Sequence, residues 1–420
     1  MKFIRSQSKI LQGRLSEPVT RIQIIAGPRQ IGKSTLVRQT LRAWNPLDFT
    51  SVSTEAGGID ADLTEQFGEV LRPGAIRDAA WLIGVWHRSS ARAAERGKRH
   101  VLVVDEIQKI SQWSEVVKGL WDADRAAAID MHVVLLGSAP LLMQRGLSES
   151  LAGRYEIIRM THWSLGEMQE AFNFSFEEYI YFGGYPGGAT LIRDEGRWRD
   201  YVIAALIRPN IEKDILQMAR VEKPALLKLL FDLGCQYSGQ ILALTKLRGQ
   251  LEDAGNVTTL ADYLHLLSQA GLLTGLQKFA MQVVRQRASP PKFNVMNTAL
   301  MSAPSGYTFA EAKADRAFWG RLVESAVGAH LINTAEQNQT VSYWRQSPYE
   351  VDFVLSTKNR ITAIEVKSGK FSGGTLGLRQ FQSEFPVTRS LVVGEAAGCD
   401  VSTAELLSYS AADWLSTGGE

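Results

Sequence analysis

A glycine-containing run near the N-terminus has the residue types and the spacing of a phosphate-binding loop. Residues 27–34 read G-P-R-Q-I-G-K-S, between a short apolar run and a helix-like segment. In such a loop glycines let backbone N–H groups approach phosphates, a lysine supplies positive charge, and a hydroxyl coordinates Mg²⁺. We therefore predict that the loop binds the triphosphate of ATP or GTP. The residues expected to contact the nucleotide or its Mg²⁺ are Gly27, Gly32, Lys33, Ser34 and Thr35.

Two carboxylates directly follow the apolar run at residues 101–104. Such a run is typical of a buried parallel strand, and α/β folds bind ligands at the carboxyl ends of these strands. At that end Asp105 would hold the Mg²⁺ ion through water, and Glu106 would orient and deprotonate an attacking water. The pattern predicts nucleotide hydrolysis. The alternative for Glu106 is a surface carboxylate in the first turn of a helix.

A third apolar run, at residues 133–136, ends in Gly137 and Ser138. A small polar side chain at this place would lie near the γ-phosphate and could sense it. The alternative is a simple turn that ends the strand.

Carboxylates also gather on two strand-like runs near the C-terminus, at residues 349–355 and 363–368. Asp352 lies on the first run, and alternation places Glu365 and Lys367 on one face of the second. Two carboxylates and a lysine on neighbouring strands can bind a divalent metal and position a water. This chemistry cleaves phosphodiesters.

The elements that must position these residues change in character along the chain. From Arg21 to about Thr161 short apolar runs alternate with longer mixed segments, which predicts a parallel α/β sheet. Amphipathic helical stretches follow, and leucine spacing between Lys223 and Leu276 predicts several short helices. Beyond residue 291 we predict a small α/β domain with a helix at 318–335 and strands at 341–344, 350–355, 361–366 and 390–393.

Composition sets the remaining limits. A chain of 420 residues is expected to form two to three domains of roughly 100 to 200 residues each. The formal charge of +2 confines any nucleic-acid surface to a local patch. The two cysteines, Cys235 and Cys399, are far apart and favour neither a zinc site nor a disulfide-stapled fold. Without an apolar leader or a membrane-length apolar run, we expect a cytoplasmic protein.

The order of these motifs resembles that of AAA+ ATPases. More narrowly, residues 27–30, 105–108, 137–138 and 150–155 resemble the prokaryotic ATPases that carry a C-terminal domain of unknown function. The resemblance covers essentially the whole chain. It implies an oligomer, a hexamer-like ring, in which an arginine of one subunit completes the neighbour's site. Arg154 stands where the resemblance places this arginine; Arg145 is the second candidate, and the alternative for Arg154 is a structural turn residue.

Residues 256–267 resemble the second helix of a winged helix-turn-helix. Leu260, Leu264 and Leu267 would pack inward, while Thr258, Thr259, Asp262 and His265 would face outward. A wing after this helix could contact DNA phosphates through Lys278, Arg285, Arg287 and Lys292. Because the proposed recognition helix has no Arg or Lys, a helical interface module is the alternative.

The C-terminal pattern resembles the PD-(D/E)xK nuclease superfamily. The resemblance assigns Asp352, Glu365 and Lys367 to the catalytic motif, Glu324 to the helical acid and Gln380 to an auxiliary role. A second divalent metal would be held by Glu324, Asp352 and Glu365. The leading proline of the motif is replaced by Val351, and both an active and an inactive domain are compatible with the pattern.

Together these features predict an AAA+ ATPase core (1–162), a helical lid (163–222), a winged-helix-like module (223–288) and a nuclease-like domain (289–420). The predicted function is an ATP- and Mg²⁺-dependent motor that remodels or translocates DNA, branched or single-stranded, with nuclease activity left open. The alternative is an ATP-dependent oligomeric switch or scaffold whose C-terminal domain binds a protein partner and cuts nothing.

Overall fold

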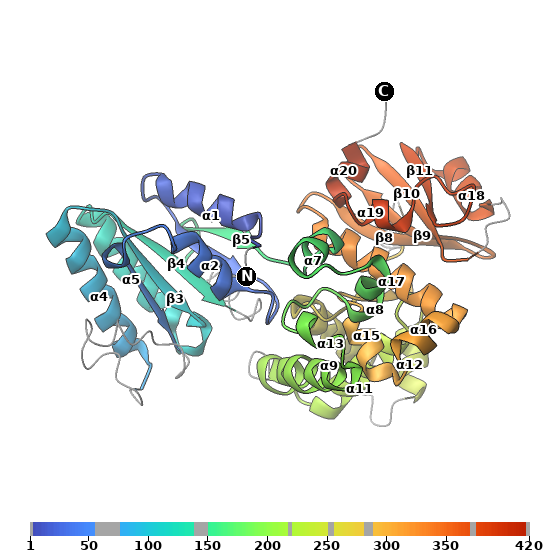
Figure 1. The fold of residues 1–420 in the computed structure, drawn as a ribbon, viewed down its shortest axis with the longest axis horizontal. Helices are drawn as coiled ribbons and strands as arrows, with labels where there is room; N and C mark the ends of the chain where they lie inside the picture. The colour runs from blue at the N-terminus through green and yellow to red at the C-terminus, as the bar shows by residue number, and fades with distance from the viewer. Residues whose placement is uncertain are drawn as a thin grey trace. The chain divides into compact units, whose positions relative to one another are not determined.

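The computed structural model describes residues 3–54, 76–137, 150–216, 221–250, 256–280, 289–369 and 375–416. The chain divides into two compact units, Met1–Met160 and Thr161–Glu420, called unit 1 and unit 2 below (Figure 1).

In the described part of unit 1, five strands form one parallel sheet in the order β2-β3-β4-β1-β5. The strands are β1 (Ile22–Ala26), β2 (Phe49–Ser53), β3 (His100–Asp105), β4 (Met131–Gly137) and β5 (Tyr155–Arg159). This arrangement confirms the predicted α/β class and the strands expected at the three apolar runs.

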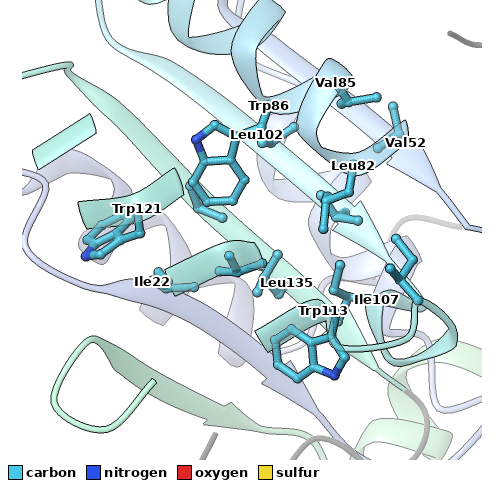
Figure 2. Packing of buried hydrophobic residues seen from close by; sticks show 14 of the residues in the cluster. Ile22, Val52, Leu82, Val85, Trp86, Leu102, Ile107, Trp113, Trp121 and Leu135 are labelled. Carbon is cyan, nitrogen blue, oxygen red and sulfur yellow. The ribbon is translucent and has the colours of Figure 1, made fainter. Parts of the chain in front are cut away.

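Both faces of this sheet are buried, which is why its strands read as continuous apolar runs. On one face Ile22, Ile24, Leu102 and Val104 pack with tryptophans of α4 (Ala79–Arg96) and α5 (Trp113–Ala126), as Figure 2 shows for part of the cluster. On the other face the residues that alternate with these, such as Ile25, Val101 and Val103, pack with α1 (Gln7–Ser16) and α2 (Lys33–Leu41).

Unit 2 begins with a helical segment. It contains α7 (Leu165–Phe172), α8 (Phe176–Phe182), α9 (Glu195–Tyr201) and two π-helical turns at Val202–Ile207 and Asn210–Ile215. Capping boxes start α7 and α8: Ser164 pairs with Glu167, and Ser175 pairs with Glu178. Next come α11 (Pro224–Gln236), α12 (Leu244–Gln250), α13 (Val257–Gln269) and an antiparallel pair formed by β6 (Leu273–Leu276) and β7 (Lys292–Val295).

The rest of unit 2 is built on a second sheet. In the described residues four strands lie in the order β11-β10-β9-β8. They are β8 (Thr340–Gln346), β9 (Tyr349–Ser356), β10 (Ile361–Lys367) and β11 (Arg389–Gly394), and all four were predicted. The accompanying helices are α15 (Ala299–Ser302), α16 (Phe309–Ala314), α17 (Arg316–Thr334), α18 (Leu376–Glu384), α19 (Thr403–Leu406) and α20 (Ala411–Ser416).

Candidate functional site

The glycines of the loop between β1 and α2 occupy positions that a side chain would disturb. Gly32 precedes α2 with φ of 93°, a left-handed conformation that residues with a Cβ rarely adopt. Gly27 lies against β5: a Cβ at this position would meet the carbonyl oxygen of Met160 at 2.1 Å. The loop can therefore keep this path only with glycine at both positions.

The loop curls around the lysine that begins α2. The Lys33 ammonium donates hydrogen bonds to the carbonyl oxygens of Gly27, at 2.9 Å, and Pro28, at 2.7 Å. The side chain is buried, at the N-terminal end of the helix. Positive charge, helix N-terminus and loop backbone thus coincide, an arrangement suited to an anion. Thr35 lies in the first turn of α2 and is exposed.

The hydroxyl and the carboxylate expected at the magnesium ion are in direct contact. Ser34 Oγ donates a hydrogen bond of 2.5 Å to Oδ2 of Asp105, the last residue of β3. Burial raises the pKa of Asp105, and the Ser34 hydrogen bond opposes that rise. Oxygen ligands of this kind are those Mg²⁺ prefers, so the residues present fit the ion.

Glu106 has an unusual backbone. Its φ of 55° and ψ of 37° are left-handed, which for a residue with a side chain costs of order 1–3 kcal/mol unless neighbours hold it. Those neighbours are present: its N–H donates to Asp105 Oδ1, its carbonyl accepts from Thr54 Oγ1, and its carboxylate accepts from Gln108. Although it precedes the 3₁₀ turn Ile107–Lys109, its side chain makes no capping hydrogen bond.

Ser138 and Arg145 lie outside the described residues. The strand that leads to Ser138, β4, lies between β3 and β1, and its last residue Gly137 is level with Ala26.

Arg154 lies at the amino ends of the sheet strands, whereas the phosphate-binding loop lies at their carboxyl ends. It precedes β5, whose first residue is level with Ile22 at the amino end of β1, and its carbonyl accepts from the Ile22 N–H. The guanidinium binds both carboxylate oxygens of Asp122 on α5, at 2.8 and 2.9 Å. Arg154 therefore does not belong to the nucleotide site of its own chain.

The C-terminal carboxylates are brought together as predicted and form a cluster with Glu350, called the acid cluster below. Oδ2 of Asp352 accepts a hydrogen bond of 2.8 Å from the Val366 N–H, which ties β9 to β10. The Lys367 ammonium lies 2.7 Å from Oε1 of Glu365. The members of the acid cluster are Glu324, Glu350, Asp352 and Glu365.

A second lysine lies within the acid cluster. The Lys292 ammonium, from β7, lies 2.6 Å from Glu324 Oε1, 3.4 Å from Asp352 Oδ1 and 3.9 Å from Glu350 Oε1. The predicted phosphate contact by Lys292 is wrong, because its side chain is fully buried. Burial lowers the pKa of Lys292, but Asp352 and Glu324 more than offset this effect, so its pKa lies above the ordinary value.

The acid cluster does not fit the predicted divalent metal. Among the residues with described positions, no group of three or more His, Cys, Asp or Glu side chains could hold a metal ion. Burial and the nearby Asp352 raise the pKa of both Glu324 and Glu365 to about 7. Gln380, the predicted auxiliary residue, is half-buried on α18 and donates to Glu384 instead.

The candidate recognition helix α13 has the predicted inner face, because Leu260, Leu264 and Leu267 are buried. Of the residues expected to face outward, Thr258, Asp262 and His265 are exposed and Thr259 is half-buried. Its amino end is capped by Asn256, which accepts from the Thr259 N–H.

Sequence reasoning did not name Glu350 as a site residue and assigned Lys292 to DNA phosphates and not to the acid cluster. Glu350 could have been found by alternation, because it lies two residues before Asp352 and so on the same face of β9. Lys292 gives no such signal, since it lies 60 residues before Asp352.

Comparisons with known protein families divide the chain into three parts. Residues 19–169 match the model described as AAA domain. The matched segment contains the loop at Gly27–Ser34, the Asp105–Glu106 pair and Arg154. Residues 173–310 and 319–399 match two models, each described as a domain of unknown function.

No curated protein matches the chain. Solved structures give distant likenesses. The Walker-type ATPase PABY2304 of Pyrococcus abyssi is 15% identical, with a TM-score of 0.47, over 71% of this chain and 94% of that one. Cdc6p of Pyrobaculum aerophilum is 13% identical, with a TM-score of 0.32, over 66% and 90%. A RuvB variant of Thermotoga maritima is 17% identical, with a TM-score of 0.30, over 64% and 85%.

Across the described ranges, none of the helices combines the length and the apolar character needed to cross a membrane.

Proposed function

We propose that this chain is an ATPase whose AAA domain binds ATP with Mg²⁺ and hydrolyses it. The observation that carries the proposal is the contact between Ser34 and Asp105, with Lys33 beside it in the loop. Lys33 would bind the outer phosphates and Ser34 and Asp105 would hold the magnesium ion. Glu106 would take the proton of the attacking water, and the hydrogen bond from Gln108 would orient its carboxylate. Ser138 would contact the γ-phosphate.

We further propose that the enzyme works as a homo-oligomeric ring, hexamer-like, in which Arg154 completes the site of a neighbour. Arg154 precedes β5 at the amino edge of the sheet, whereas the loop lies at the carboxyl edge. An arginine at that edge can reach a γ-phosphate only on another subunit. Asp122 binds the guanidinium within the chain, and in the ring the γ-phosphate of the neighbour's nucleotide would bind it instead.

Subunit mixing tests this arrangement. Lys33→Ala removes nucleotide binding but keeps Arg154. Arg154→Ala keeps the nucleotide site but lacks the arginine that completes the neighbour's site. Each variant alone should lose ATP turnover by 100-fold or more, and mixing the two should restore part of it, because some interfaces then combine an intact loop with an intact arginine. Arg21→Ala, at the same edge of the sheet, is the control. If mixing restores nothing although both variants oligomerise, Arg154 does not act in trans.

The proposed task of this hydrolysis is the remodelling or translocation of DNA. Support comes from the order of α11, α12, α13 and β6, which is that of a winged helix whose second wing strand, β7, lies beyond the boundary predicted at residue 288. We propose that the chain is divided into a core (1–162), a lid (163–222), a winged-helix-like module (223–288) and a nuclease-like domain (289–420).

A second candidate is an ATP-dependent switch or scaffold whose C-terminal domain binds a protein partner. The observation that favours it is Lys292, which fills the acid cluster where a nuclease would need a metal. ATP turnover measured with single-stranded, duplex and branched DNA separates the two candidates. Stimulation several-fold by one of these forms supports the DNA motor, and no stimulation by any of them supports the scaffold.

A further inference from the structure

We infer that the ammonium group of Lys292 replaces the divalent cation in the acid cluster, so that unit 2 is held together there by an internal cation and binds no metal. The inference concerns unit 2 alone and does not depend on the proposed ATPase activity.

Three carboxylates from two elements face one ammonium group: Glu324 from α17, and Glu350 and Asp352 from β9. The shortest of these distances is 2.6 Å, a close charge-assisted contact. A metal ion placed among the same oxygens would lie within a few ångströms of a positive charge that burial and the carboxylates hold in place.

Three of the four oxygens of the two motif carboxylates are already bound, and Glu365 Oε2 is buried without a hydrogen-bond partner among the described residues. Asp352 Oδ1 faces Lys292, and Asp352 Oδ2 accepts from the Val366 N–H. Glu365 Oε1 faces Lys367. Each of the two motif carboxylates therefore has a donor or cation supplied by the chain, as buried charges require.

Lys292 also joins the two segments that match domains of unknown function. It belongs to the first segment (173–310), and Glu324 and Asp352 belong to the second (319–399). Neighbouring contacts cross the same junction: Lys278 pairs with Tyr343 by a β-bridge, and Phe279 packs into the core beneath β8 and β9. The lysine is thus the ionic part of an interface between two sequence families within one folded unit.

Binding of Mn²⁺ to the full-length chain without nucleotide, followed by electron paramagnetic resonance of the free ion, tests the inference. Wild type and Asp352→Asn should bind the same number of ions. Lys292→Met should gain one Mn²⁺ ion per chain, and the double variant Lys292→Met with Asp352→Asn should lose it again. Lys313→Met, an exposed lysine of the same unit, is the matched control.

Thermal unfolding provides the second readout. Lys292→Met should lower the Tm of unit 2 by 5 °C or more, because it leaves carboxylates without their cation, and Mn²⁺ should recover part of this loss. Wild type should show no such gain. Mn²⁺ binding by wild type that disappears in Asp352→Asn would overturn the inference, even if Lys292→Met does not fold. A folded Lys292→Met that gains no Mn²⁺ would overturn it as well.

Discussion

His100 and His132 lie buried on the neighbouring strands β3 and β4 of unit 1, each at or beside the first residue of its strand. The ring of His100 lies within hydrogen-bonding distance, 2.9 Å, of Thr50 Oγ1 on β2. Burial lowers the pKa of both histidines to about 4. At neutral pH both histidines are therefore uncharged. Because neither belongs to the nucleotide site, they make the stability of unit 1 depend on pH independently of catalysis.

This sensitivity has a definite sign. The pKa of His100 in the folded state, about 4, lies below the unfolded value of 6.5, so the unfolded chain binds the proton first. The stability that depends on the uncharged state of His100 is fully present above pH 6.5 and is lost as the pH falls toward 4. At pH 4.5 this histidine should have cost unit 1 about 2 kcal/mol of unfolding free energy. Denaturant titrations at pH 7 and 4.5 should show a smaller loss for His100→Gln. The same loss in His100→Gln as in the exposed-site control His87→Gln would contradict the prediction.

Glu106 carries the prediction that separates turnover from binding. Glu106→Gln should lower kcat for ATP by about 10²- to 10⁴-fold, because the amide cannot take the water's proton. Binding should persist, since the phosphate contacts belong to the loop and Lys33. Steady-state turnover and the ATP-dependent rise in Tm measure the two effects, with exposed Glu95→Gln as control. Loss of the Tm rise in Glu106→Gln would assign the carboxylate to binding instead.

At the scale of elements, the path of the phosphate-binding loop depends on how closely β1 and β5 approach each other. The Met160 N–H bonds to the Ala26 carbonyl, and the Met160 carbonyl then faces Gly27. The close pairing of two strands thereby decides which residue the loop can carry.

Gly27→Ala should accordingly weaken ATP binding by 10-fold or more, since the added methyl group would collide with the backbone carbonyl of Met160 as well as with Ile31 Cδ1. Gly13→Ala, in α1 with nothing within 4 Å, should instead stabilise unit 1 by about 0.5–1 kcal/mol. Calorimetric ATP titrations and denaturant unfolding of both variants check the pair. Wild-type affinity in Gly27→Ala would show that the loop can move without loss.

At the scale of the whole molecule, the division into two compact units predicts independent folding. Residues 1–160 and 161–420, produced separately, should each unfold cooperatively. Saturating ATP with Mg²⁺ should raise the Tm of the first fragment only, because the phosphate site lies within it. Calorimetry of the two fragments and the full chain checks this, and a fragment without a cooperative transition would contradict it.

Sequence reasoning reached the parts of the fold that local patterns determine. The loop motif, the strand β3 with its carboxylates and the four strands of the second sheet follow from apolar runs and short spacings. Lys292 could not be placed in this way, because β7 reaches the acid cluster only through tertiary packing. Asp122 was missed as the partner of Arg154 for the same reason: α5 and the turn before β5 are distant in sequence.

The left-handed backbone at Glu106 sets stability against activity at a single position. Glycine adopts this conformation without cost, and asparagine adopts it more readily than most residues do. A library randomised at position 106 and sorted only for resistance to proteolysis should therefore enrich glycine and asparagine. The same library sorted for ATP turnover should return glutamate. A difference between the residues that the two selections enrich would show that the chain gives up folding free energy to keep a carboxylate at position 106.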